Sequence, residues 1–181
     1  MFNIKNFSTM KKNFFSILSI AAFATFITIS SCNKDNTGKK EEGGVKPAEF
    51  VDLDLTSHTK WKSENEPGFY DYESAMSKFG ESMPTKTQLE ELKYECNWVW
   101  NDSKKGFDRK GSNGNSIFLP AAGYIDCVGD LRKVCELGFY WSSTLAPESG
   151  YAWDYYFVSD SVGIYSSSFC HNLSVRLVQN D

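Results

Sequence analysis

Residues 151–158 read YAWDYYFV, a stretch dominated by aromatic side chains. Aromatic residues favour strands, in which successive side chains point to opposite faces of a sheet. Because an isolated buried carboxylate is costly, Asp154 is expected to face solvent with the other even-numbered residues of the stretch. The alternate side chains are therefore predicted to fill the core: Trp153, Tyr155 and Phe157.

The stretch FYWSST at residues 139–144 is predicted to be a neighbouring strand. Alternation places Phe139 and Trp141 on one face and Tyr140 on the other. Burying two large rings would contribute about 3–6 kcal/mol, at roughly 1.5–3 kcal/mol each. The strand is therefore interpreted mainly as scaffold, with Tyr140 as its one candidate for contact outside the core.

Other segments with strand-like composition surround these two. Turn-forming residues separate them, among them the stretch from Pro147 to Gly150. An alternating pattern predicts a half-buried strand where order begins, near Glu49. The further predicted strands are SIFLPAAGY at 116–124, VGIYSSSF at 162–169 and LSVRLV at 173–178.

Two helices are predicted before most of the strands. In residues 71–80 an apolar face recurs at helical spacing, and Gly80 is placed to end the helix. After Pro84, Thr85 and Gln88 form a capping-box pattern that starts a second helix. Its buried stripe is predicted to be Leu89, Leu92 and Cys96. Helices followed by an antiparallel sheet indicate the α+β class.

The beginning of the chain has the pattern of an export signal. From Met10 two lysines precede a long uncharged apolar run, which ends in Ile-Ser-Ser-Cys at residues 29–32. This ending resembles the bacterial lipobox, in which the cysteine is lipidated. Residues 1–31 are thus predicted to be a lipoprotein signal peptide and Cys32 the lipidated residue; the alternative is an ordinary signal in which Cys32 is incidental.

Residues 32–48 then form a polar, glycine-containing linker, and residues 49–181 are predicted to be the folded domain. The three lysines of residues 1–31 leave 16 of the 19 basic residues in the rest of the chain, against 23 acidic ones. Because binding to a nucleic-acid backbone requires a basic face, no nucleic-acid partner is expected. The expected location is the cell envelope, anchored to the outer membrane on its periplasmic or outer surface.

Four cysteines remain when Cys32 is set aside. In an exported domain they permit two disulfides, with three possible connectivities. Cys127 and Cys135 enclose a short loop and are the first candidates for a pair, which would leave Cys96 to pair with Cys170. Four free thiols are the alternative. Neither the cysteines nor the two histidines have the spacing of a zinc site, and no cofactor is expected.

Four motifs in order, MPTKTQLEEL, NGNSIFLPAAGY, GFYWSST and LSVRLV, resemble the Fibrobacter succinogenes major paralogous domain family. That resemblance implies a C-type lectin-like fold, with two helices, a small twisted antiparallel sheet and long loops. The chain is also distantly similar to formylglycine-generating enzymes, but it does not have the pattern of cysteines that binds copper in those enzymes. In the family's C-terminal strand, Arg176 would be a buried partner for a carbonyl or carboxylate. The Glu66-Pro67-Gly68 and Trp100-Asn101-Asp102 triplets lie in the wrong positions for a lectin calcium site.

A polar and aromatic face is left over from the predicted core. Tyrosine and serine are the residues that antibody binding loops use for recognition. The candidate ligand-binding residues are Tyr140, Asp154, Tyr156, Tyr165, Ser167, Phe169 and His171. The favoured function is non-catalytic binding of a protein or glycan; the alternatives are a structural subunit of a surface polymer acting through strand pairing, an oxidase of the formylglycine type, or a polar face that binds nothing.

Overall fold

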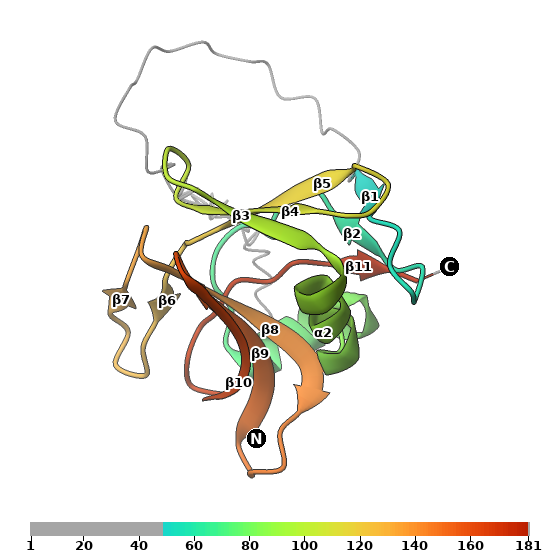
Figure 1. Ribbon diagram of the computed structural model, residues 1–181. Helices are drawn as coiled ribbons and strands as arrows, with labels where there is room; N and C mark the ends of the chain where they lie inside the picture. The colour runs from blue at the N-terminus through green and yellow to red at the C-terminus, as the bar shows by residue number, and fades with distance from the viewer. Residues whose placement is uncertain (1–48, 181) are drawn as a thin grey trace, which may run out of the picture.

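The computed structural model describes residues 49–180 (Figure 1). The predicted signal peptide, Cys32 and the whole predicted linker lie outside the described residues. Within the described part of the chain, no helix is long and apolar enough to cross a membrane.

Residues 49–180 are β-rich, with two α-helices and eleven strands. The strands form four small sheets, in which every pairing of named strands is antiparallel. The predicted α+β class, a C-type lectin-like arrangement of two helices and one small sheet, is therefore wrong. Two helices do form, but most of the regular structure is divided among separate sheets.

The strands fall into four groups (Figure 1). The first sheet has the order β1 (Phe50–Asp52), β2 (Lys60–Lys62) and β11 (Val178–Gln179). The second has the order β3 (Asn97–Asn101), β4 (Gly106–Lys110) and β5 (Ser116–Pro120). The third has the order β10 (Ser161–Ser168), β9 (Tyr151–Val158) and β8 (Leu137–Leu145), and the fourth pairs β6 (Tyr124–Ile125) with β7 (Leu131–Arg132).

Both predicted helices form where local signals start and stop them. Helix α1 (Tyr72–Phe79) is capped at its N-terminus by Asp71, whose side chain accepts a hydrogen bond from the Ser74 backbone. Its C-terminal cap is Gly80, with a φ of 47°. Helix α2 (Lys86–Glu95) has the predicted capping box between Thr85 and Gln88. Its stripe of Leu89, Leu92 and Cys96 is buried, as predicted. A short 3₁₀ turn, η1 (Gly80–Ser82), connects the helices.

The β8–β9–β10 sheet is covered on both faces. One face contributes Tyr140, Tyr155 and Phe157 to a core that includes the two buried leucines of α2. The opposite face contributes Trp141 and Ala152 to a second cluster, which includes Tyr72 and Ala75 of α1. Strand β9 is the middle strand, so both of its backbone edges are paired, and it has buried side chains on both faces.

This two-sided covering corrects the prediction for Asp154. The alternation itself is present, since Tyr155 and Phe157 are buried as predicted. However, Asp154 is also completely buried, whereas its neighbour Trp153 is only half-buried. The prediction that Asp154 faces solvent is wrong because it assumed that one face of the sheet is exposed to solvent.

The predicted disulfide pairs are also wrong. Cys127 bonds to Cys170, with 5.0 Å between their Cα atoms, so Cys127 cannot pair with Cys135. Cys96 is a buried free thiol. The observed bridge ties the hairpin of β6 and β7 to the segment that follows β10.

Candidate functional site

Five aromatic rings lie in a continuous row across one end of the β8–β9–β10 sheet. We call His171, Tyr124, Phe139, Tyr156 and Tyr165 the aromatic row. Neighbouring ring centroids are separated by 5.5, 5.2, 5.0 and 5.3 Å in that order. These distances lie within the favourable range for aromatic pairs, and three of the four contacts are edge-to-face. The row is therefore a single packed unit.

The row draws its rings from distant parts of the chain. Phe139 and Tyr156 are direct cross-strand partners in β8 and β9. Tyr124 comes from β6, which is joined to β8 through a bridge between Gly123 and Gly138. Paired backbone hydrogen bonds of 3.0 and 2.9 Å between Ile125 and Asn172 hold the His171 end beside β6. The nearby Cys127–Cys170 disulfide fastens the same two segments covalently.

Tyr165 forms the exposed end of the row. Its side chain is 55% exposed, whereas the other four members are half-buried. The ring folds back over Gly163, where an added methyl group would collide with it. Because Gly163 is directly opposite Tyr156 in the β9–β10 pairing, its missing side chain lets the two tyrosines meet.

A basic side chain lies beside the middle of the row. Lys133 follows β7 and lies near Tyr124 and Tyr156. Its ammonium group also forms a 2.8 Å ion pair with Glu136. Arg132, in β7, lies near Tyr124 and forms ion pairs with Asp126 and Asp130. The row thus combines apolar ring surface with hydroxyl groups and exposed basic groups along one side.

Asp154 lies under the exposed end of this surface. It is directly opposite Trp141 on one side and Tyr165 on the other. Burial raises the pKa of its carboxyl group to about 7, and the nearby Ser167 hydroxyl partly offsets that effect. Neither carboxylate oxygen has a partner with ordinary hydrogen-bond geometry among residues 49–180. Burial therefore favours the protonated form of the carboxyl group below about neutral pH.

Tyr140 was predicted to be available for outside contact, and this is wrong. The side chain is buried, and its hydroxyl donates to the Pro120 carbonyl at 2.7 Å and accepts from Asn65 at 3.1 Å. The oxygen of the Asn65 amide accepts from Arg176 Nε at 2.8 Å. Burial accordingly raises the pKa of Tyr140 to about 12. Tyr140 belongs to the scaffold.

The remaining predicted binding residues have different environments. Ser167 is buried, so its predicted exposure is wrong. Phe169 is half-buried and stacks on Tyr72 with 4.5 Å between ring centroids. Tyr156, Tyr165 and His171 are brought together in the aromatic row. Tyr124 and Phe139 were missed as site residues, because nothing local in the sequence indicates that β6 lies beside β8.

Arg176 and Arg109 are both fully buried but differ in how their charge is accommodated. Arg176 donates to the carbonyl groups of Lys62, Ser63 and Phe118 at 2.7–2.9 Å, in addition to its bond to Asn65. This confirms the structural role expected for it.

The guanidinium group of Arg109 has no hydrogen-bond partner among residues 49–180 and lies instead near three aromatic rings. The ring centroids are 5.3–5.7 Å from its guanidinium carbon and belong to Trp98, Phe107 and Tyr155. Burial lowers its pKa to about 9. The sequence did not single out this residue.

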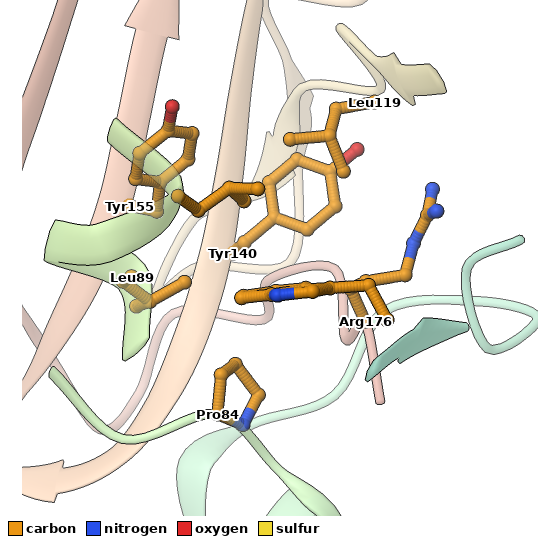
Figure 2. A pocket seen from close by; sticks show the side chains of 8 residues that line it. Pro84, Leu89, Leu119, Tyr140, Tyr155 and Arg176 are labelled. Atoms are coloured by element: carbon orange, nitrogen blue, oxygen red, sulfur yellow. The ribbon is translucent and has the colours of Figure 1, made fainter. Parts of the chain in front are cut away.

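The interior beside Tyr140 does not provide a second site. Figure 2 shows Tyr140, Tyr155, Leu89 and Arg176 among the side chains that line a small gap in the core. The gap is too small to hold a water molecule. The aromatic row is therefore the better candidate for ligand contact.

The sequence profile of a protein family, described as a domain of unknown function (DUF8237), matches residues 85–178. The chain belongs to this family. The DUF8237 match starts at the cap of α2 and ends in β11, so it includes every member of the aromatic row. No curated protein and no solved structure has significant similarity to the chain.

Proposed function

We propose that this member of the DUF8237 family is a lipid-anchored module of the cell envelope that binds a protein or glycan ligand through the aromatic row, without catalysing a reaction. The anchor is proposed from the lipobox-like ending at Cys32, with the outer membrane as its location. Binding is proposed from the geometry of the domain.

The observation that carries the binding proposal is the row of rings in mutual contact that ends at an exposed tyrosine. Rigid aromatic side chains with polar tips give contact area at little cost in conformational entropy. Here each ring contacts its neighbours in the row, and the Cys127–Cys170 disulfide joins the two chain segments at the His171 end. A ligand would therefore meet a preorganised surface, which reduces the ordering cost of binding.

The test is to probe two arrays, one of glycans and one of purified proteins, with the full chain. Tyr165→Ala is expected to reduce capture at least about 10-fold, which is the effect of losing an aromatic hot-spot residue. The melting temperature should change little because the side chain is more than half exposed. The matched control is Tyr94→Ala, which removes an even more exposed tyrosine outside the row.

The two arrays also decide between the ligand classes, because capture on one of them alone assigns the class. Equal capture by wild-type protein and Tyr165→Ala, on whichever array responds, would remove the row from the binding surface. The anchor is tested separately: Cys32→Ser should move the protein from the membrane fraction to the soluble fraction. Retention of this variant in the membrane would contradict lipidation at that residue.

A further inference from the structure

Strand β3 leaves one backbone edge of its sheet unpaired. It lies at the outside of the β3–β4–β5 sheet and pairs only with β4 among the described strands. Its sequence, Asn-Trp-Val-Trp-Asn, contains no charged residue and no proline. Natural edge strands commonly carry such residues to prevent pairing with other chains.

The side chains of this edge are unusually apolar for their exposure. Trp98 is 42% exposed and Val99 is 64% exposed. Exposed apolar groups gathered at one place on a surface are characteristic of an interaction site.

The strand is also a palindrome centred on Val99. In an antiparallel pair related by a two-fold axis at Val99, each Val99 would face its counterpart. Trp98 of one copy would face Trp100 of the other, and Asn97 would face Asn101. Such an isologous contact brings the same surface of both copies together.

The side-chain arrangement of the monomer is compatible with this symmetry. Trp98 and Trp100 contact the same ring, Phe107, at 5.0 and 5.2 Å and both in edge-to-face geometry. The two tryptophans therefore lie on the inner face of the sheet with Phe107, which is the direct cross-strand partner of Trp100. By alternation, Val99 occupies the outer face. Each tryptophan would meet a tryptophan of the other copy on one face, and no charge would be buried.

We propose that the β3 edge is a self-association surface, through which two copies of this chain pair antiparallel across a two-fold axis at Val99. A second copy is the occupant that the strand's own sequence specifies, because a palindrome matches its own reverse at every position. A foreign strand would gain nothing from that symmetry. Five paired residues make a small interface, so the dimer forms reversibly and depends on concentration.

The pairing predicts one specific cross-link in the full chain. Directly opposite residues of antiparallel strands have Cα atoms about 4.5–5.5 Å apart, a distance that suits a disulfide. Val99→Cys should therefore give a disulfide-linked dimer under mild oxidation. Ser159→Cys, in the exposed turn between β9 and β10, is the control and should give only background dimer. The native thiol of Cys96 is buried, and burial raises its pKa to about 11, which suppresses its reaction.

Two further variants establish the register. Asn97→Cys alone should not cross-link to itself, since the two introduced thiols would lie about four residues apart, or roughly 13 Å. Mixed with Asn101→Cys it should form a heterodimer, because these positions face each other.

Charge at the axis provides an independent test. Val99→Lys would place two ammonium groups opposite one another and should weaken dimerisation at least about 10-fold in sedimentation, whereas Val99→Thr should retain it. Dimer from Val99→Cys no greater than from Ser159→Cys would overturn the proposal. So would sedimentation of Val99→Lys identical to that of the wild-type protein.

Discussion

Gly163 lies directly opposite Tyr156 in the β9–β10 pairing, and the ring of Tyr165 occupies the space above it. A methyl group at this position would strike that ring. We expect Gly163→Ala to displace Tyr165 from Tyr156 and weaken ligand capture on the responding array. Stability should fall by less than about 1 kcal/mol, because an exposed side chain can move aside at little cost.

Gly138 provides the matched control for that experiment. It lies opposite Phe157, and a methyl group there would strike the ring of Phe157, which is buried in the core. Overpacking a buried site typically costs about 1–3 kcal/mol. Urea unfolding should therefore show a larger loss for Gly138→Ala than for Gly163→Ala. Equal losses would mean that Tyr165 is held as firmly as the core.

Because of Asp154, the free energy of unfolding should fall as the pH rises through the acidic range. Its pKa in the folded protein is raised by burial to about 7, whereas an unfolded aspartate titrates near 3.9. Between these values the folded state holds a proton that the unfolded state has lost. The unfolding free energy should then decrease by up to about 1.4 kcal/mol per pH unit, and level off above the higher pKa.

Asp154→Asn removes this titration and keeps the shape of the side chain. Urea unfolding at several pH values from about 4 to 8 should show a flatter profile for the variant, which becomes the more stable protein at the alkaline end. The difference between the two profiles isolates Asp154 from other titrating groups. Parallel profiles would show that Asp154 is ionised in the folded protein throughout the range.

The two buried arginines should respond in opposite ways to replacement by methionine. Arg176→Met would leave three carbonyl groups and the Asn65 side chain without their donor, which should cost about 3–5 kcal/mol. Arg109→Met removes a cation that has no hydrogen-bond partner within residues 49–180, and should leave the unfolding free energy unchanged or raise it by up to about 2 kcal/mol. Thermal and urea unfolding of the two variants measure both changes in stability. A large loss for Arg109→Met would show that its contacts with the three rings outweigh the cost of its burial.

The Cys127–Cys170 bridge should stabilise both the domain and the His171 end of the aromatic row. It joins residues 43 positions apart, and closing a loop of that length is worth about 2–4 kcal/mol in the unfolded chain. The free energy of unfolding of the double variant Cys127→Ser with Cys170→Ser should be lower by that amount. Hydrogen exchange should also increase at Ile125 and Asn172, whose backbones are paired beside the bridge. Unchanged exchange there would mean that backbone pairing alone holds the segments together.

Features encoded by neighbouring residues could be predicted from the sequence. The capping box of Thr85 and Gln88 and the Gly80 stop depend on residues within one turn, and both predictions are confirmed. Strands β8, β9 and β10 were also found, because turn residues separate them. In contrast, LSVRLV was predicted to be a strand, but only its last residue, Val178, lies in β11; Ser174 forms an isolated bridge with Tyr140 of β8.

The remaining errors concern contacts between distant segments. Burial of Asp154 depends on the covering of both sheet faces, which alternation within β9 cannot reveal. Tyr140 is buried because Asn65 and Pro120, far away in sequence, satisfy its hydroxyl. Cysteine pairing depends in the same way on which loops meet. Strand β4 was missed because glycine, lysine, serine and asparagine residues on both sides of it resemble turns, although Phe107 and Arg109 are buried.

The small β1–β2–β11 sheet brings the first and last strands of the domain to either side of β2, with Val51 and Val178 both opposite Trp61. Two strand spacings separate these partners, roughly 10 Å. A short flexible peptide could therefore join the two ends, and the chain could be opened at another loop without changing the order of the sheets. The architecture is suited to circular permutation and to insertion as a cassette within a loop of a host protein.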